Sequence, residues 1–240
     1  MVETPDNMSA WHPKYPKIQS IFKRDPKTKY KTFLEWEFST PEFEMLQDIE
    51  WLWVEKLDGT NMRVGYSPPA GGFISIGGRT DKAQIQDPLH QWITERITAE
   101  KMRDVFGENR IVTLYGEGVG SGIQKDGFQY GDQHLVLFDV LVDDGSGGIW
   151  LEQDSVKDVA EKLGIPVAPF SFYCSIADMV DFVKHRPGYE SDYVTARTPD
   201  FASRTEGYVG RPIITLLDRM GQRIITKIKM KDYHPGEYSG

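Results

Sequence analysis

Apolar and polar residues alternate, or apolar residues run together, in several short stretches of the chain, and both patterns are typical of β-strands. The segments with these patterns are 51–57, 61–66, 73–79, 110–117, 134–142, 206–212, 213–218 and 223–230. Two turn-like sequences, SPPAGG at 67–72 and DDGSGG at 143–148, separate neighbouring segments of this kind. They predict hairpin connections between antiparallel strands.

Three further segments carry the start and stop signals of helices: 87–107, 154–164 and 175–185. In the first, Asp87 is the expected N-cap, Pro88 lies in the first turn and Gly107 ends the helix. The second ends at Gly164, and the third opens with the Ser-x-x-Asp pattern of a capping box. Hairpin-connected strands with helices between them predict an α+β fold of mainly antiparallel sheets flanked by helices.

The composition narrows the class of protein. Of the 240 residues, 39% are hydrophobic and 27% are charged, as in soluble globular chains. No apolar run approaches the ~20 residues that cross a bilayer, and the first residues lack the apolar core of a signal peptide. The single cysteine, Cys174, cannot form an internal disulfide or a cysteine metal site. We therefore expect a cytoplasmic protein with no membrane partner.

The charge restricts how the chain could bind nucleic acid. The formal net charge is −8, which excludes binding by bulk positive charge and requires a local patch. The segment 14–31 carries seven basic residues and one acid, with Tyr15, Phe22 and Tyr30 interleaved. Aromatic rings among cations suit bases and phosphates together. The alternative interpretation is a solvated N-terminal arm.

Lys56 stands in the sequence EKLDGTNMRV, between the apolar residues Val54 and Leu57 and just before an Asp-Gly pair. One interpretation is a surface lysine on a strand that turns at Gly59. The other is a lysine nucleophile, because cationic neighbours, a metal ion or burial make the amine easier to deprotonate. Glycine also lets the backbone approach a ligand closely. This segment alone leaves both interpretations open.

Two glutamates are followed directly by glycine at the ends of predicted strands: Glu117 in LYGEGVGSG and Glu206 in RTEGYVGRP. A carboxylate beside glycine can meet a ribose hydroxyl or a hard metal ion, because no neighbouring side chain blocks access. Asp58 and Asp139 are further candidates of this kind. Taken singly, each of the four is more simply explained as a turn carboxylate.

Lys227, Lys229 and Lys231 alternate in the sequence TKIKMKDY, so on a strand they share one face. Three cations on one face repel one another unless an anion lies opposite, and a triphosphate would satisfy them. The alternative is an edge strand that lysines protect against aggregation.

Taken together and in this order, the motifs resemble those of the covalent nucleotidyltransferase superfamily, which includes nucleic acid ligases and mRNA capping enzymes. The matching motifs are EKLDGTN with the nucleophile Lys56, GGRT with Arg79, YGEGVG with Glu117, LFDV with Phe138, EGYVGRP with Glu206, and KIK with Lys227 and Lys229. The resemblance spans about residues 50 to 233. It implies a nucleotidyltransferase domain with an ATP-grasp-like arrangement of antiparallel sheets and helices.

The resemblance also implies a reaction in three steps. Lys56 attacks the α-phosphorus of ATP and expels pyrophosphate, which leaves a lysyl-AMP. The AMP then passes to a 5′-phosphate end, and a 3′-OH attacks that end and releases AMP. Lys227 and Lys229 would hold the α-phosphate, because phosphoryl-type transfer depends on in-line placement and charge neutralisation.

The residues that the resemblance places around the nucleotide are Glu55, Asp58, Asn61, Arg79, Glu117, Phe138 and Glu206. Glu117 would accept from the ribose hydroxyls, Phe138 would stack on adenine and Arg79 would touch ribose or phosphate. Asp58 and Asn61 would position the nucleophile or metal-bound water. Glu206 and Asp58 would bind Mg²⁺ or Mn²⁺, which would screen the phosphates.

Within the superfamily, Asn61 after Gly-Thr resembles the RNA ligase branch, and KYPKIQSIF resembles the opening of phage-type RNA ligases that seal 3′-OH to 5′-phosphate ends. The expected function is therefore an ATP-dependent RNA ligase in RNA repair, acting on RNA or a nicked duplex. The alternatives are a compact DNA ligase or capping-type core, and a non-catalytic module that binds nucleic acid ends. Arg211 stands where the family usually has lysine, which leaves the role of that position open.

The same resemblance guides the expected domain organisation. We expect residues 1–240 to form a single adenylyltransferase domain, with the basic extension 1–49 packed on it. DNA ligases and capping enzymes carry an OB-fold domain after the last motif, and many RNA ligases carry a helical domain. The sequence predicts neither, so a protein partner that supplies such a domain is a further expectation.

Overall fold

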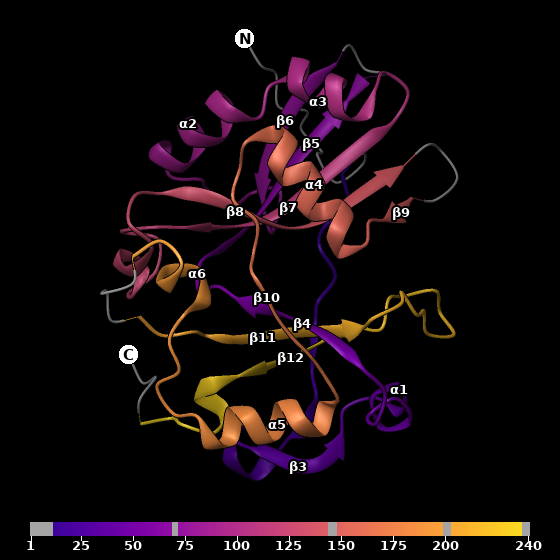
Figure 1. Cartoon of the computed structure of the whole chain (residues 1–240), viewed down its shortest axis with the longest axis vertical. Coiled ribbons are helices and arrows are strands. Elements are labelled where there is room, and N and C mark those ends of the chain that lie inside the picture. The colour runs from indigo at the N-terminus through magenta and orange to yellow at the C-terminus, as the bar shows by residue number, and fades with distance from the viewer. Residues whose placement is uncertain (1–11, 69–71, 144–147, 199–202, 237–240) are drawn as a thin grey trace. The chain divides into compact units, whose positions relative to one another are not determined.

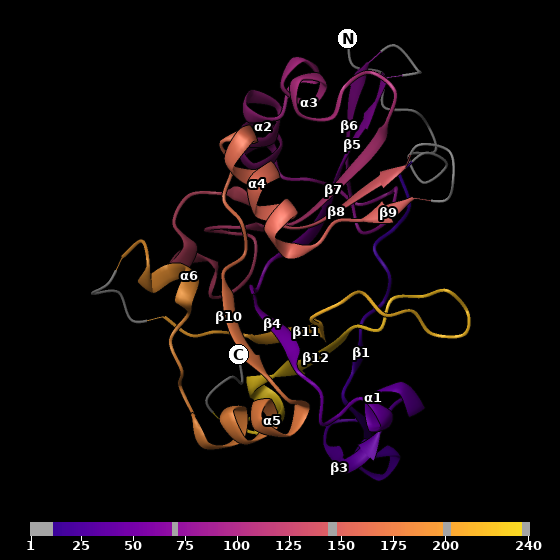
Figure 2. The same cartoon turned by 45° about the vertical axis from the view of Figure 1, so that its right-hand side comes forward.

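The computed structural model describes residues 12–68, 72–143, 148–198 and 203–236. The chain forms two compact units (Figures 1 and 2). Unit 1 contains residues 1–16 and 58–168, and unit 2 contains residues 17–57 and 169–240. The division falls between Leu57 and Asp58, directly after the segment that carries Lys56.

Unit 1 is built on a five-stranded antiparallel sheet in the order β6-β5-β7-β8-β9. Its strands are β5 (Thr60–Ser67), β6 (Phe73–Gly78), β7 (Ile111–Val119), β8 (His134–Asp143) and β9 (Ile149–Trp150). Its helices are α2 (Asp87–Arg96), α3 (Ala99–Phe106) and α4 (Gln153–Leu163), with a 3₁₀ turn η4 (Gly127–Tyr130). The helices pack on one face of the sheet around a single apolar core (Figure 2).

The other face of this sheet carries the described start of the chain. The ring of His12 lies over Gly65 and bonds the hydroxyls of Thr113 and Ser67, both at 2.9 Å. A Cβ at position 65 would stand 2.2 Å from that ring, so glycine makes the contact possible. The Tyr15 hydroxyl donates to Asp139 at 2.8 Å. The N-terminal segment is thus part of unit 1 up to residue 16.

Unit 2 is built on a second five-stranded sheet in the order β1-β12-β11-β4-β10, beside a two-stranded sheet of β2 and β3. The strands are β1 (Gln19–Ser20), β2 (Phe22–Arg24), β3 (Phe33–Phe38), β4 (Trp51–Lys56), β10 (Phe170–Cys174), β11 (Gly207–Pro212) and β12 (Thr226–Lys229). The helices are η2 (Pro26–Thr28), α1 (Pro41–Met45), α5 (Ile176–His185), α6 (Asp192–Thr195) and η5 (Met230–Asp232). Among the strands described for unit 2, only β1 pairs in parallel, with β12.

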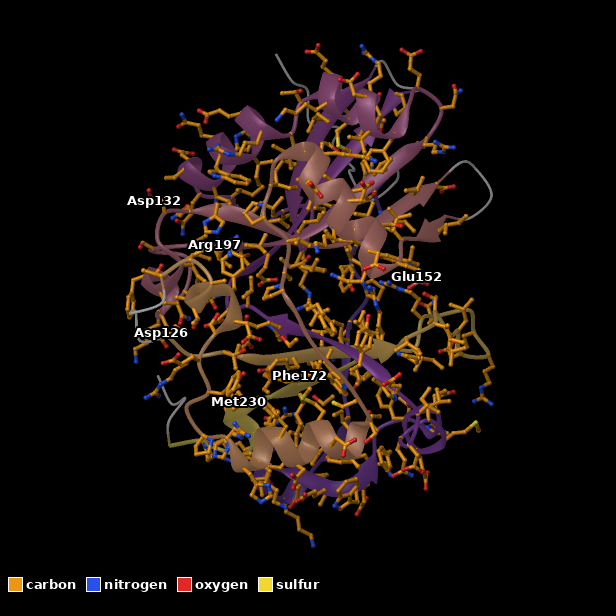
Figure 3. All side chains as sticks on the ribbon, viewed as in Figure 1. Asp126, Asp132, Glu152, Phe172, Arg197 and Met230 are labelled. Atoms are coloured by element: carbon orange, nitrogen blue, oxygen red, sulfur yellow. The ribbon has the colours of Figure 1, made fainter. Side chains whose placement is uncertain are left out.

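The core of unit 2 lies between one face of its larger sheet and α5 (Figure 1). Trp51, Trp53 and Tyr208 are fully buried there, and the rings of the two tryptophans stack 6.0 Å apart. Phe172 and Met230, labelled in Figure 3, contribute to the same cluster. Because neighbouring residues on a strand point to opposite faces, this core leaves Lys56 and the alternate residues of β4 on the other face.

The expected class, α+β with mainly antiparallel sheets, is confirmed by this architecture. The turn sequences at 67–72 and 143–148 fall partly outside the described residues. The two strands that flank each turn are paired with one another in antiparallel orientation, as hairpins require. Ser67 lies opposite Phe73, and Leu141 lies opposite Trp150. The helices expected at 154–164 and 175–185 are present, and Ser175 and Asp178 form the predicted capping box.

Three expectations about elements are wrong. The segment 87–107 is two helices, because Thr98 leaves the helical path and its hydroxyl accepts from the amide of Lys101, which caps a new helix. Gln86, rather than Asp87, is the N-cap of the first of the two. The segment 213–218 is not a strand. Its apolar residues Ile213, Ile214 and Leu217 are 46–64% exposed, and among the described residues Leu217 makes only an isolated bridge, to Arg223.

The strand expected at 223–230 is shorter than predicted, since only Thr226–Lys229 pairs as β12. The sequence pattern also missed the short strands β1, β2, β3, β9 and β10. The expectation of one adenylyltransferase domain with residues 1–49 packed on it stays a prediction. No helix in the part of the chain that the structure describes is long and apolar enough to cross a membrane.

Candidate active site

Unit 2 places two lysines side by side on one sheet face. On the central strand β11, Gly207 aligns with Lys56 of β4 on one side and with Lys229 of β12 on the other. Aligned residues on neighbouring strands point to the same face. The two ammonium groups therefore flank a residue that has no side chain.

Gly207 is required by this arrangement. Its φ of +148° is a backbone conformation that other residues rarely adopt. A Cβ here would stand 2.2 Å from the carbonyl oxygen of Ile228 and 2.8 Å from the Cα of Lys229. Glycine thus lets β11 lie close to β12 where the two lysines emerge.

The carboxylate of Glu206, one residue before β11, joins the two lysines. Its Oε2 accepts from the Nζ of Lys56 and its Oε1 from the Nζ of Lys229. The side chains are 23%, 14% and 21% exposed for Lys56, Glu206 and Lys229, so the cluster is only partly open to water. Burial by itself would raise the pKa of Glu206, but the two ammonium groups outweigh it and hold that pKa below its ordinary value.

Lys227 lies two residues before Lys229 on β12 and aligns with Val209 of β11. It therefore shares the face of Lys56 and Lys229, as the alternation predicted. Lys231 does not, because β12 ends at Lys229 and Lys231 lies in the 3₁₀ turn η5. The prediction of three lysines on one strand face is therefore wrong: only Lys227 and Lys229 share that face of β12.

Glu55 points to the face of β4 opposite that of Lys56, because neighbouring residues on a strand alternate between the two faces. Its side chain is buried at 3% exposure, and its Oε2 accepts from the backbone amide of Tyr193 at 2.9 Å. Burial raises the pKa of Glu55 to about 7, although hydrogen bonds from Ser191, Tyr193 and Thr205 act in the other direction.

In unit 1, three of the sequence-predicted residues share the sheet face that is turned away from the helices. Asn61 of β5 aligns with Glu117 of β7, and Glu117 aligns with Val136, two residues before Phe138 on β8. The Oδ1 atom of Asn61 is buried without a hydrogen-bond partner in the described part of the chain. Such an orphaned acceptor is a place for a ligand donor.

Arg79 and Asp58 lie at the same end of this sheet. Arg79 follows β6 directly and is exposed, and β6 ends opposite the start of β5 because Gly78 aligns with Met62. Asp58 precedes β5, and its backbone amide donates to the Tyr130 hydroxyl at 3.1 Å.

Two supporting residues were not found from the sequence. The Tyr15 ring stands edge-on to Phe138, with centroids 5.1 Å apart, and its hydroxyl bonds the next residue, Asp139. The Gly207 backbone sets the spacing of Lys56 and Lys229. The Glu-Gly pair at 206–207 was a usable sequence signal for Gly207, whereas no local pattern connects Tyr15 with Phe138.

The three aromatic rings of the segment 14–31 are not all exposed, as the patch suggested by the sequence would require. Phe22 is buried at 1% exposure in the core of unit 2, and Tyr15 belongs to unit 1. Only Tyr30 of the three interleaved rings is exposed, at 63%.

No group of three or more metal-ligating side chains gathers among the residues that the structure describes. Glu206 and Asp58 therefore stay predicted ligands, each with a carboxylate of the kind that Mg²⁺ prefers. The roles of the other site residues likewise stay predictions at this point.

Comparison with known proteins gives a family match and a fold match. A family model described as RNA ligase matches residues 49–229. No curated protein sequence matches the chain. Among solved structures, a variant of Naegleria gruberi RNA ligase with ATP and Mn matches with a TM-score of 0.61 at 15% identity, over 95% of this chain and 60% of that one.

Two further structures of the Naegleria gruberi RNA ligase agree. A variant with AMP and Mn has a TM-score of 0.60 at 15% identity, over 93% of this chain and 59% of that one. The enzyme with PPi has a TM-score of 0.58 at 17% identity, over 95% and 60%. At these identities the likeness shows the fold alone, and the chain spans about 60% of the length of these proteins.

Proposed function

Because the chain belongs to the RNA ligase family, we propose that it is an ATP-dependent RNA ligase that works through a covalent lysyl-AMP. The Lys56 ammonium group would first lose a proton to water, and its free amine would then attack the α-phosphorus of ATP, forming an N–P bond while the bond to pyrophosphate breaks. The AMP would pass to the 5′-phosphate end of RNA, and a 3′-OH end would then displace AMP. Solved structures of Naegleria gruberi RNA ligase contain ATP, AMP, PPi and Mn, the nucleotide, products and metal that this reaction needs.

The observation that carries the proposal is the carboxylate held between two ammonium groups. Glu206 bridges Lys56 and Lys229 on a partly open sheet face, with Lys227 two residues away on the same face. A face that holds one anion between two cations is suited to a phosphate group. Lys227 and Lys229 would neutralise the charge that develops as pyrophosphate leaves, which is the main demand of this type of transfer.

The remaining nucleotide contacts are proposed for unit 1. Phe138 would stack on adenine, and Tyr15 at its edge limits how the ring can turn. Glu117 would accept from the ribose hydroxyls, and Arg79, exposed after β6, would meet ribose or phosphate. Asn61 would offer its buried, unsatisfied Oδ1 to a metal-bound water.

A divalent ion, Mg²⁺ or Mn²⁺, is proposed to bind at Glu206 and Asp58 and to screen the phosphates. Oxygen ligands suit both ions. Glu55 also stays a proposed member of the nucleotide site; because its side chain lies on the core face and accepts from the Tyr193 amide, its proposed part is to hold the strand that carries Lys56.

The substrate is proposed to be RNA ends, either free or at a nick in a duplex, in a cytoplasmic RNA repair reaction of the phage type. A protein partner that supplies a further domain also stays a proposal. Charge supports the choice of a local binding site over bulk attraction, because the chain has a net charge of −8.

A sealing assay tests the function. We expect the protein, with ATP and Mg²⁺, to join a 5′-phosphate to a 3′-OH at a nick whose 3′-OH strand is RNA, and Lys56→Ala to be inactive. Lys157→Ala, at an exposed lysine on α4, is the matched control and should seal like the wild type.

Three outcomes would contradict the RNA ligase assignment. Sealing of all-DNA nicks alone would favour a DNA ligase, and a preference for GTP would favour a capping-type enzyme. Binding of ends without any joining, at every combination of substrate and metal, would favour a non-catalytic module.

A further inference from the structure

Three non-glycine residues with a left-handed backbone occur in the described part of the chain, and all three lie within eight residues of one another. They are Lys29 with φ of +56°, Tyr30 with φ of +63° and Trp36 with φ of +68°. This conformation is unfavourable for bulky side chains and persists only where the surroundings enforce it. Two of the three are aromatic residues that remain exposed, Tyr30 at 63% and Trp36 at 50%.

The turn that carries Lys29 and Tyr30 is held by many hydrogen bonds. The Asp25 side chain accepts from the amide of Lys27 at 2.8 Å, and the amide of Tyr30 donates to the carbonyl of Asp25 at 3.0 Å. The hydroxyl of Thr28 accepts from the amide of Thr32 at 3.1 Å. These bonds hold the turn between β2 and β3 in one conformation, so the backbone that carries the Tyr30 ring is preorganised.

Arg24 anchors this turn to the rest of unit 2. Its guanidinium pairs with Asp232 at 2.8 Å and lies over the Phe33 ring, 4.6 Å from the centroid. The Asp232 side chain is 4% exposed, so this pair is shielded from solvent. Arg24 is therefore engaged in structure, unlike the lysines of the turn.

The charge of the turn is positive and its acids are already engaged. Lys27, Lys29 and Lys31 are exposed, and none of them pairs with a carboxylate in the described part of the chain. Asp25 caps the turn. On β3, Glu35 pairs with Lys184 at 2.9 Å and Glu37 lies 3.9 Å from Lys23. In a chain with a net charge of −8, this is a local cationic surface with an exposed ring in its middle.

We propose that residues 25–36 form a docking surface for single-stranded RNA, with Tyr30 stacking on a base and Lys27, Lys29 and Lys31 contacting phosphates. Stacking on an aromatic ring requires an unpaired base, and the exposed lysines before and after Tyr30 in the sequence offer cations to the phosphates of the same strand. The inference rests on the proposed function only for the choice of RNA as the occupant.

The test is RNA binding by Tyr30→Asn, measured without ATP by the fluorescence anisotropy of a short labelled single-stranded RNA that lacks a 5′-phosphate. Asparagine tolerates the left-handed backbone, so thermal stability should be unchanged or higher while the Kd rises about 5-fold or more. Tyr30→Phe keeps the ring and should bind like the wild type. Replacing the three lysines by glutamine should lower the slope of log Kd against log salt by up to about 2.

The matched control is Tyr173→Asn, at a ring of unit 2 that is 58% exposed outside this surface; it should bind RNA like the wild type. Equal loss in Tyr173→Asn and Tyr30→Asn, or unchanged binding in Tyr30→Asn, would overturn the proposal. Tighter binding of fully duplex RNA would overturn it too. Because the assay contains no ATP and no 5′-phosphate, its result does not depend on adenylylation of Lys56, so a failure of the ligase assignment is distinguishable from a failure here.

Discussion

At the scale of single residues, two glutamates of unit 2 show how the same side chain takes opposite properties. Glu206 lies between two ammonium groups, which hold its pKa below the ordinary value despite burial. Glu55 is buried on the core face, where no cation lowers its pKa, and burial raises that pKa to about 7. Their pH dependences of stability should therefore have opposite signs.

For Glu55 we expect stability to fall as the pH rises. The folded state holds the proton up to about pH 7, whereas the unfolded chain releases it near the ordinary value of ~4.5. The folding free energy that protonated Glu55 contributes is therefore complete below pH ~4.5 and lost as the pH rises through ~7. In chemical denaturation, the unfolding free energy of the wild type should fall by up to about 3 kcal/mol relative to that of Glu55→Gln as the pH rises across this range.

Glu206→Gln is the control of opposite sign. The stabilisation from ionised Glu206 is present above the unfolded pKa and lost as the pH falls, so this variant should differ from the wild type most at neutral pH and least in acid. A flat difference between the wild type and Glu55→Gln from pH 4.5 to 7 would show that Glu55 is not held in its neutral form.

At the scale of elements, β11 sets the geometry of the lysine cluster through its first residue. Gly207→Ala should cost more than about 2 kcal/mol of unfolding free energy, because the added Cβ meets the Ile228 carbonyl oxygen at 2.2 Å in a strained conformation. The methyl group would separate β11 from β12, so Lys56 adenylylation should fall further than stability alone explains. Thermal melting and nucleotide labelling measure the two effects.

The comparison for that variant is Gly221→Ala, in the loop between β11 and β12. Gly221 also has a positive φ, +77°, but a Cβ there meets nothing within 4 Å. Its replacement should cost about 1 kcal/mol from strain alone and leave labelling intact. Equal effects of the two substitutions would show that the close approach of β11 and β12 is unimportant.

The elements also show where sequence patterns suffice. The helices at 153–163 and 176–185 were predictable because their caps and apolar spacing are local properties. The break at Thr98 was not, because both halves of 87–107 read as helix and only the hydrogen bond to Lys101 separates them. The strands β1 and β9 have two residues each, too few for any period to appear.

At the scale of the whole molecule, the match to the RNA ligase family covers residues 49–229 and so includes parts of both units. The order of the motifs along the chain could be read from the sequence, and with it the choice of Lys56, Glu206 and Lys229 as candidate site residues. Their contact could not, because it depends on the register of β4, β11 and β12, which come from positions about 150 and 20 residues apart. The burial of Glu55 on the core face of β4 could not be predicted for the same reason.

The central claim is that Lys56 carries the nucleotide. The direct test is to incubate the protein with α-labelled ATP and Mg²⁺, denature it and look for label that remains on the chain. The account predicts label on the wild type and on Lys157→Ala, and none on Lys56→Ala. Label that persists on Lys56→Ala, or a folded wild type that never acquires any with Mg²⁺ or Mn²⁺, would contradict it.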